Sequence, residues 1–171
     1  MIPTVLLTLA CGLIAAQFNH ALGTTPVLGA VLCASLFLSR KDLWIVGLGG
    51  MILRDLILGL SLFTFVRLGA MALVILAVTA LKLRPNFRSL LTGLLIASPI
   101  FHLALAAGDW ATGTCGQWAK TPQGFAAAIG STVPYFQRSF IGDFLFTALF
   151  LAAYSAVLSR TLVLRRQEQA G

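Results

Sequence analysis

Four ionisable side chains in this sequence lie inside long apolar runs, where charge is rare. Arg54 and Asp55 stand side by side within residues 49–60, which are otherwise Leu, Ile, Met and Gly, while His102 and Asp143 lie in two later apolar runs. An ionisable group at the centre of a bilayer costs about 2.5–3.5 kcal/mol on insertion scales, so it usually faces a protein interior or a wet cavity and has a partner there. These residues therefore indicate either a polar ligand site or ion pairs between helices.

The sequence lacks the patterns that carry known catalytic or metal chemistry. It contains no Gly-x-Ser-x-Gly, no Walker-type loop, no His-Glu-x-x-His and no pair of histidines at metal spacing. Ser98 and His102 are one helical turn apart, whereas the two members of an intramembrane serine–histidine pair normally come from separate helices. Cys11, Cys33 and Cys115 are far apart and form no Cys-x-x-Cys. We expect no enzyme activity, no cofactor and no metal site.

The composition is typical of a membrane protein. Of 171 residues, 58% are hydrophobic and 10% charged, against about half and about a quarter in an average soluble domain. The net charge of +7 comes from short basic clusters between apolar runs, not from one dense patch with exposed aromatic residues. We therefore expect contact with the lipid bilayer and no nucleic-acid binding.

The apolar runs predict a single all-α transmembrane domain over residues 1–171, a six-helix bundle. The runs are apolar on every face, unlike the alternating strands of a membrane barrel. Small residues spaced four apart, Gly12 with Ala16 and Ala30 with Ala34, would allow close helix contacts. The expected helices are 2–18, 26–39, 43–63, 65–81, 89–107 and 139–159, with a long outer segment at 108–138. The helix at 26–39 is short for a full span of about 20 residues.

The distribution of basic residues predicts the orientation of this bundle. One side receives eight of them: Arg40, Lys41, Lys82, Arg84, Arg88, Arg160, Arg165 and Arg166. The other side receives three: Arg67, Lys120 and Arg138. Because Lys and Arg concentrate in short cytoplasmic loops, both termini are expected in the cytoplasm.

With that orientation, the buried polar residues fall in the outer half of the bilayer. At about 1.5 Å per helical residue, Asp55 lies about 18 Å and His102 about 20 Å from the cytoplasmic ends of their helices. Asp143 lies about 6 Å below the outer surface. We expect Asp55 and Asp143 to flank one cavity, with Arg54 or Arg67 as countercharge. Because neighbours on a helix point about 100° apart, Arg54 and Asp55 are expected to pair with other helices and not with each other.

The outer loops add further candidate ligand contacts. Asn19, His20 and Thr25 lie in the first outer connection, and Trp110, Trp118 and Tyr135 in the long outer segment. Aromatic residues there are also favoured simply by the headgroup region. The full set of candidate ligand-binding residues is Asn19, His20, Thr25, Arg54, Asp55, His102, Trp110, Trp118, Tyr135 and Asp143.

Three stretches, TTPVLGAVLCASLFLSR, MILRDLILGL and VPYFQRSFIGDFLFTALFLAAYS, resemble a family of small bacterial inner-membrane proteins of unknown function. The sequence departs from that family's pattern where Arg54 replaces a serine-like position and where NHALGT replaces a Pro-Asn-Phe-like lead into Thr25. The matching positions are Thr25, Pro26, Gly29, Ala30, Asp55, Gly59, Pro134, Phe136, Gly142, Asp143 and Thr147.

That family is in turn similar to the substrate-binding S components of energy-coupling factor (ECF) vitamin transporters. The resemblance implies six helices, an outward-opening pocket and location in the bacterial inner membrane. Asp55 and Asp143 would orient a vitamin-like small molecule, the three outer aromatic residues would cover it, and residues 19–25 would gate the pocket. Transport would need a coupling membrane subunit and ATPases as partners.

A membrane scaffold or assembly subunit that binds another protein, and no small molecule, is the alternative. An outward cavity lined by Asp55, His102 and Asp143 would favour ligand binding. Tightly paired charges with no cavity between them would favour the scaffold.

Overall fold

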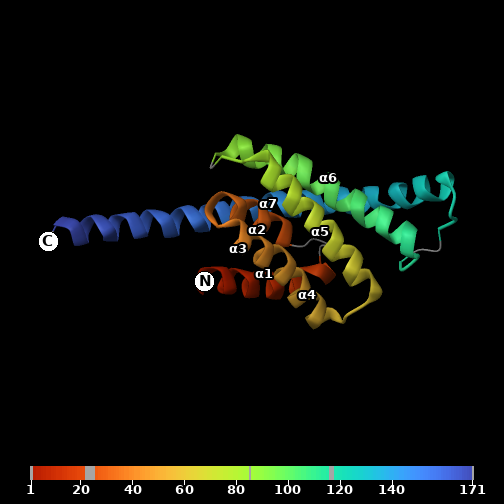
Figure 1. Cartoon of the computed structure of the whole chain (residues 1–171), viewed down its shortest axis with the longest axis horizontal. Coiled ribbons are helices and arrows are strands. Elements are labelled where there is room, and N and C mark those ends of the chain that lie inside the picture. The colour runs from red at the N-terminus through yellow and green to blue at the C-terminus, as the bar shows by residue number, and fades with distance from the viewer. Residues whose placement is uncertain (1, 22–25, 85, 116–117, 171) are drawn as a thin grey trace.

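The computed structural model describes all residues except 1, 22–25, 85, 116–117 and 171, and for residues 2–4, 7, 18–21 and 154–170 it describes the backbone alone. All regular elements in the described part are helices (Figure 1). They are α1 (Ile2–Ala21), α2 (Val27–Phe37), α3 (Arg40–Trp44), the π-helical turn η1 (Ile45–Gly49), α4 (Gly50–Leu58), α5 (Leu62–Leu81), α6 (Phe87–Thr112) and α7 (Pro122–Ala170). The all-α prediction is thus confirmed.

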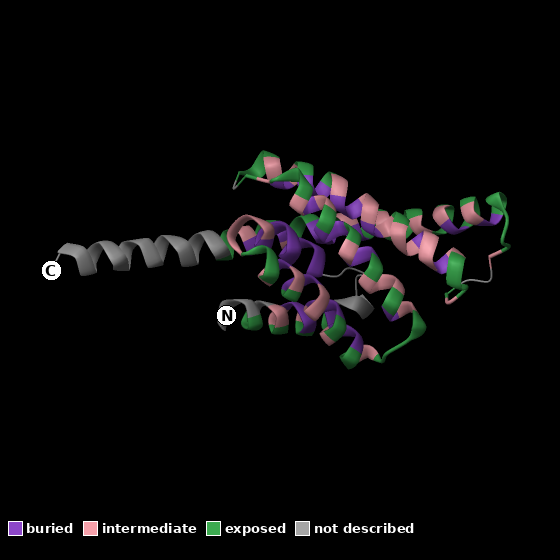
Figure 2. Cartoon of the chain, in the orientation of Figure 1, coloured by how far each residue is buried: buried purple, intermediate pink, exposed green. Residues whose placement is uncertain are grey.

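Helix α2 forms the centre of the molecule. Residues 27–34 are all buried (Figure 2), as expected for a helix that is hydrophobic all round. Gly29 lets α2 approach α7 closely, since a Cβ there would lie 2.8 Å from the backbone nitrogen of Thr147. The Cys33 thiol, one turn further on, donates a hydrogen bond to the Thr147 carbonyl at 3.3 Å. At Gly29 and Cys33, α2 therefore lies directly against the backbone of α7.

The helix predicted at 43–63 is a continuous run of α3, η1 and α4 that begins at Arg40 and ends earlier, at Leu58. It stops there because Gly59 has a φ of 103°, a conformation that favours glycine. Ser61 then opens α5 with a capping box, in which its side chain and that of Thr64 satisfy each other's backbone N–H groups. The turn between the two helices therefore lies at 59–61 and not at 63–65.

The long outer segment predicted at 108–138 is mostly helical in the structure. Helix α6 continues to Thr112, and α7 begins at Pro122, so the connection is only residues 113–121. Pro122 is favoured at a first helical position, where no N–H is needed, and the hydroxyl of Thr121 accepts the N–H of Gly124 at 3.1 Å. Pro134 lies inside α7 and does not start it.

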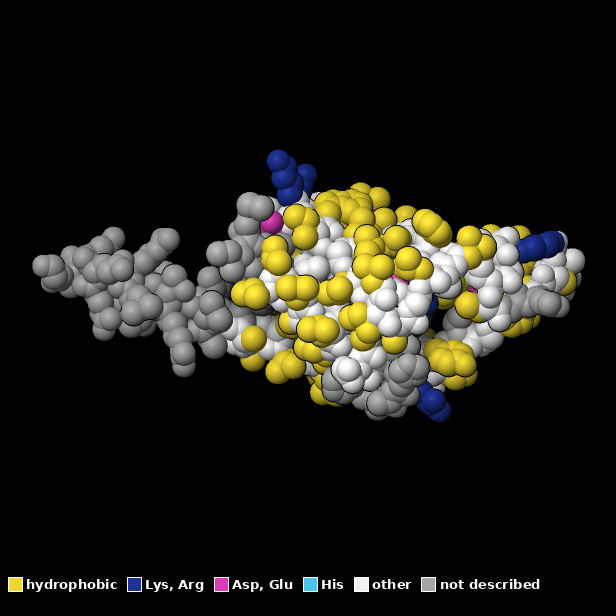
Figure 3. All heavy atoms as spheres, turned by 90° about the horizontal axis from the view of Figure 1, so that it is seen from below, with side chains coloured by type: hydrophobic (Ala, Val, Ile, Leu, Met, Phe, Trp, Pro, Cys, Tyr) yellow, Lys and Arg dark blue, Asp and Glu magenta, His cyan; other side chains and the backbone are white. Residues whose placement is uncertain are grey.

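Three helices in the described part are long and apolar enough to cross a membrane: Leu62–Leu81, Phe87–Thr112 and Pro122–Ala153. Two shorter apolar helices cover Thr8–Gln17 and Val27–Phe37. The structure therefore supports membrane-length helices, and the six-helix bundle stays a prediction. Hydrophobic side chains cover much of the outer surface seen in Figure 3. The exposed ones include Phe65, at 72%, and a four-residue repeat of Ile141, Leu145 and Leu149. Such a surface is compatible with contact with lipid.

The connections divide between two ends of the molecule (Figure 1). Helix α3, the α5–α6 turn and the C-terminal part of α7 lie toward one end, and the α4–α5 and α6–α7 connections toward the other. The first group holds the sequence positions of the basic clusters counted above. The fold thus places those clusters on one side, as a common cytoplasmic face would require.

Candidate ligand-binding site

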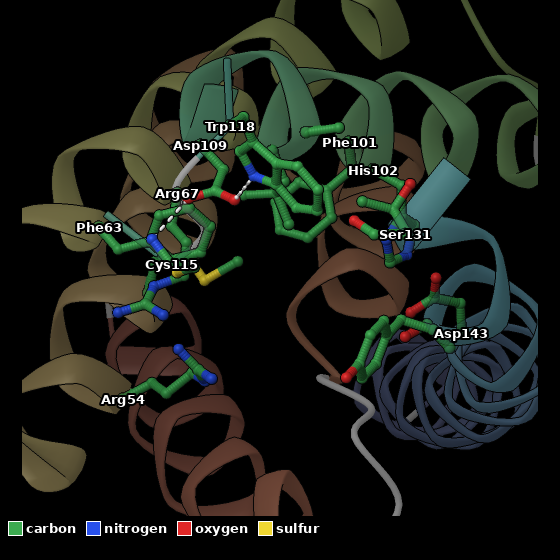
Figure 4. Close-up of a pocket in the computed structure, with 16 residues that line it drawn as sticks. Arg54, Phe63, Arg67, Phe101, His102, Asp109, Cys115, Trp118, Ser131 and Asp143 are labelled. Carbon is green, nitrogen blue, oxygen red and sulfur yellow. Dashed lines mark hydrogen bonds between the residues drawn. The ribbon is translucent and has the colours of Figure 1, made fainter. Parts of the chain in front are cut away.

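A cavity of about 510 Å³ opens between α4, α5, α6, α7 and the 113–121 loop (Figure 4). Its volume is in the range of small-molecule sites, about 300–1,000 Å³. It lies toward the end of the molecule that carries the α4–α5 and α6–α7 connections. The lining residues are Met51, Arg54, Phe63, Arg67, Phe101, His102, Leu105, Ala106, Asp109, Cys115, Trp118, Ser131, Thr132, Tyr135, Ser139 and Asp143.

One side of the cavity is cationic. Arg54 from α4 and Arg67 from α5 both line it, and both guanidinium groups bind the same carboxylate, that of Asp55. Arg54 Nη1 lies 2.6 Å from Asp55 Oδ1, and Arg67 donates to Oδ2 from Nε at 3.0 Å and from Nη2 at 2.9 Å. Asp55 is 1% exposed and does not itself line the cavity. Its carboxylate therefore fixes the positions of the two arginines without reaching the cavity surface.

The expectation that Arg54 and Asp55 would not pair with each other was wrong. Their Cα–Cβ bonds do point apart, but the Arg54 side chain is long enough to turn back to its neighbour, at 2.6 Å. The expected pairing with another helix holds for Asp55, through Arg67. The side chain of Arg67 is placed by its own helix, since Thr64, one turn earlier, accepts from Nη2 at 3.5 Å and Phe63 lies under its guanidinium at 5.1 Å.

The opposite side of the cavity carries hydroxyl groups and a carboxylate. Ser131, Tyr135, Ser139 and Asp143 recur every four residues on α7 and so share one helix face. Asp143 is 3% exposed, and its Oδ2 accepts a hydrogen bond from the buried Ser98 hydroxyl of α6 at 3.0 Å. In Figure 4, Asp143, Ser131 and His102 lie across the cavity from Arg54 and Arg67.

Aromatic rings form the walls between these two sides. His102 packs edge-on against Phe101, with ring centroids 5.7 Å apart, and against Phe136, at 5.5 Å. Phe63, Trp118 and the exposed Tyr135 complete the walls. The cavity is therefore apolar and flat-walled in its middle and polar at two separate places, which is the usual composition of a small-molecule site.

The 113–121 loop closes one end of the cavity and is held by two successive residues of α6. On the cavity side, the Asp109 carboxylate accepts the N–H of Cys115 at 2.6 Å and the indole N–H of Trp118 at 2.7 Å. On the other side, the Trp110 indole donates to the Ala119 carbonyl at 2.9 Å, and Lys120 binds the Trp110 carbonyl. The loop is thereby attached firmly to the last turn of α6.

The structure brings together five of the ten predicted contact residues: Arg54, His102, Trp118, Tyr135 and Asp143 line the cavity. Asp55 lies behind its wall, and Trp110 braces the loop outside it, against Phe125. Thr25 and the side chains of Asn19 and His20 lie outside the described residues, as does the predicted gate at 19–25.

Sequence reasoning missed Asp109, Ser131 and Thr132 as cavity residues. All three fall in the segment at 108–138 that was expected to lie outside the helix bundle. The four-residue spacing from Ser131 through Ser139 to Asp143 was the available signal, because it continues the polar face of the last helix beyond its expected start. Within the described residues, no cluster of three or more His, Cys, Asp or Glu side chains could hold a metal ion.

Cys115 offers a measurable probe of this end of the cavity. Partial burial is the main cause that raises the pKa of its thiol, and the nearby negative charge of Asp109 raises this pKa further. Because a thiolate reacts and a thiol does not, maleimide labelling should be slower near neutral pH than for a free cysteine and should increase up to a higher pH. Asp109→Asn removes the negative charge while keeping an acceptor, so the midpoint of the rate against pH should move to lower pH.

The control for this labelling experiment is Asp42→Asn, on α3 at the other end of the molecule. It should leave the pH profile unchanged. Cys11 and Cys33, both 0% exposed, should react only after unfolding. Identical midpoints for the parent and Asp109→Asn would contradict the placement of Asp109 beside Cys115.

Fold and cavity together define an all-helical protein with membrane-length helices and an internal polar site. The chain belongs to DUF6580, a family of unknown function, whose sequence profile matches residues 1–166. No curated protein and no solved structure matches it significantly.

Proposed function

We propose that this protein is the membrane-embedded, small-molecule-binding subunit of an ECF-type uptake transporter, with its cavity open to the outer face of the bacterial inner membrane. The observation that carries the proposal is the cavity of about 510 Å³, with arginines on one side, a carboxylate on the other and aromatic walls between. A protein whose buried charges served packing alone would need no such space between them.

The orientation and the partners follow from the same reading. The cavity lies at the opposite end of the helices from the basic clusters, so cytoplasmic clusters would place its opening outside. The sequence has no nucleotide-binding loop, so energy for uptake would come from partner ATPases, acting through a coupling membrane subunit. The link to ECF transporters rests on the sequence resemblance given above.

The direct test is thermal unfolding of the purified protein in detergent, across a panel of vitamins, cofactor precursors and other small metabolites. A compound that binds only the folded form at 100 times its Kd adds about 2.7 kcal/mol. For a chain of this size, each kcal/mol corresponds to roughly 2–4 °C. We therefore expect at least one compound to raise Tm by roughly 5–10 °C.

Two neighbouring positions on α7 provide a matched control for that test. Ser131 lines the cavity, whereas a Cβ on its neighbour Gly130 would have no atom within 4 Å. Ser131→Trp should fill part of the cavity and abolish the ligand-induced rise in Tm, and Gly130→Trp should keep it. Equal responses from both variants would mean that the compound binds elsewhere.

The scaffold alternative makes a different prediction for the same samples. The tight Arg54–Asp55–Arg67 cluster is the feature that favours it. If no compound in the panel shifts the Tm of folded protein, and Asp143→Asn lowers stability or the recovery of a protein partner without changing uptake by cells, the scaffold is the correct reading.

A further inference from the structure

The cavity has two polar places of opposite character, and this restricts what can fill it. At one side, two guanidinium groups share the single carboxylate of Asp55, so this cluster of three side chains carries one net positive charge. Both arginines reach the cavity surface, whereas Asp55 does not. Guanidinium groups are planar donors that match carboxylate and phosphate oxygens. This side therefore suits an anionic group.

Asp109 is the other carboxylate near this side and must be considered. Its described hydrogen bonds come from neutral donors of the loop, the Cys115 N–H and the Trp118 indole N–H, with the Thr114 hydroxyl further off at 3.4 Å. These hydrogen bonds direct the Asp109 carboxylate to the loop, whereas the two ion pairs at the arginines are made by Asp55. Asp109 therefore holds the loop at this end of the cavity.

The other side is an acceptor site. Among the described residues, the Ser98 hydroxyl is the one hydrogen-bond donor to the Asp143 carboxylate, at Oδ2. A carboxylate has about four acceptor positions on its two oxygens, and Asp143 lines the cavity. An N–H group of a bound molecule could supply a further hydrogen bond there. Nearby Ser131 and Ser139 add hydroxyl groups but no positive charge.

The space between the two sides is bounded by rings: Phe63, Phe101, His102, Trp118 and Tyr135. Aromatic side chains bind flat rings by offset or edge-on stacking, worth more than the buried area alone. A flexible aliphatic chain would gain nothing from this geometry beyond its burial.

We propose that the cavity binds a flat ring compound that is amphoteric: an anionic group, carboxylate or phosphate, contacts Arg54 and Arg67, and an N–H donor at the far side contacts Asp143. This inference rests on the proposed function and specifies its substrate class. The ring lies between the aromatic walls, and the Trp118 indole, held by Asp109, covers it.

Matched compounds test the class. 6-Amino-2-naphthoate carries both groups, 2-naphthoate lacks the amine, and 6-amino-2-naphthamide lacks the anion. The same three forms are included for 4-aminobenzoate. Binding is measured by Tm shift and by titration calorimetry on the purified full chain. We expect the two amino-substituted carboxylates, 6-amino-2-naphthoate and 4-aminobenzoate, to bind most tightly. Loss of the anionic group should raise Kd on the order of tenfold to a hundredfold.

Variants locate the two contacts. Arg54→Gln leaves Asp55 paired with Arg67, at 2.9 Å. It should reduce the affinity for the amino-substituted carboxylates to the affinity for the corresponding amides. Asp143→Asn keeps an acceptor for Ser98 and should abolish the preference for the amino compounds over the deaminated acids. Arg88→Gln, on an exposed position of α6, is the control and should bind as the parent does. If Arg54→Gln does not fold, the Asp143→Asn comparison still decides the matter.

The outcomes separate this inference from the function on which it rests. If neutral or purely cationic compounds stabilise the protein as well as the amino-substituted carboxylates do, the proposed substrate class is wrong, but the proposed small-molecule binding is still supported. Equal binding of acids and amides, or unchanged binding by Arg54→Gln, also overturns the class. If no compound of this set or of the metabolite panel binds folded protein, the proposed function itself fails.

Discussion

Asp55→Asn should lower the Tm of the protein by on the order of 10 °C, the largest effect that we expect from a single side chain. The substitution keeps the size of the side chain but removes the carboxylate that forms ion pairs with both Arg54 and Arg67. Arg54 is 6% exposed, so its charge would stay buried without its counterion. Loss of one partner of a buried ion pair costs about 3–5 kcal/mol.

Two further variants make this prediction specific. In Asp55→Asn combined with Arg54→Gln, the most deeply buried positive charge is also removed, and part of the lost stability should return. Asp42→Asn lies in the first turn of α3, where the carboxylate accepts a hydrogen bond from Ser39 and forms no ion pair among the described residues, and it should change Tm little. A Tm for Asp55→Asn equal to that of Asp42→Asn would contradict the cluster. The measurement is thermal unfolding in detergent, without ligand.

Gly29→Ala should be the second strongly destabilising change, because it separates α2 from α7. A Cβ at Gly29 would lie 2.8 Å from the backbone nitrogen of Thr147 and 3.1 Å from the carbonyl carbon of Phe146. Backbone atoms cannot turn away as a side chain can, so one helix must move. Overpacking of this kind typically costs about 1–3 kcal/mol, and the Cys33–Thr147 hydrogen bond would be lost with it.

Gly69→Ala on α5 is the matched control, since nothing lies within 4 Å of a Cβ there. An alanine in a helix interior is more stable than a glycine by roughly 0.5–1 kcal/mol, so Gly69→Ala should keep or raise Tm. The two variants differ from the parent by the same methyl group. Equal melting temperatures for Gly29→Ala and Gly69→Ala would therefore show that α2 and α7 are not packed as described.

Hydropathy was enough to predict the helical class and the approximate places of the helices, because long apolar runs have few alternatives in a membrane. The helix predicted at 65–81 is observed as Leu62–Leu81, and that at 89–107 as Phe87–Thr112. Hydropathy predicted that the last helix begins at residue 139, whereas α7 begins at Pro122. Residues 122–138 mix Gly, Ser, Thr and Gln with apolar residues, so their helical state depends on packing against α6 and not on apolar length.

The site was predictable in its members but not in its geometry. The rarity of charge within apolar segments pointed to Arg54, His102 and Asp143, and all three line the cavity. Which partner a long arginine side chain selects cannot be read from helix phase, as the Arg54–Asp55 contact shows. The bracing of the loop by Asp109 and Trp110 depends on how the chain turns at Gly113, whose φ of 66° ends α6.

The burial of α2 constrains how the protein is assembled during synthesis. At 11 residues, this helix extends only about 16 Å, roughly half the hydrocarbon thickness of a bilayer. The face of α2 that carries Gly29 fits against α7, which is synthesised after the other described helices. Until then, that face of α2 has no permanent neighbour, and nascent chains truncated before α7 should be substrates for membrane quality-control proteases.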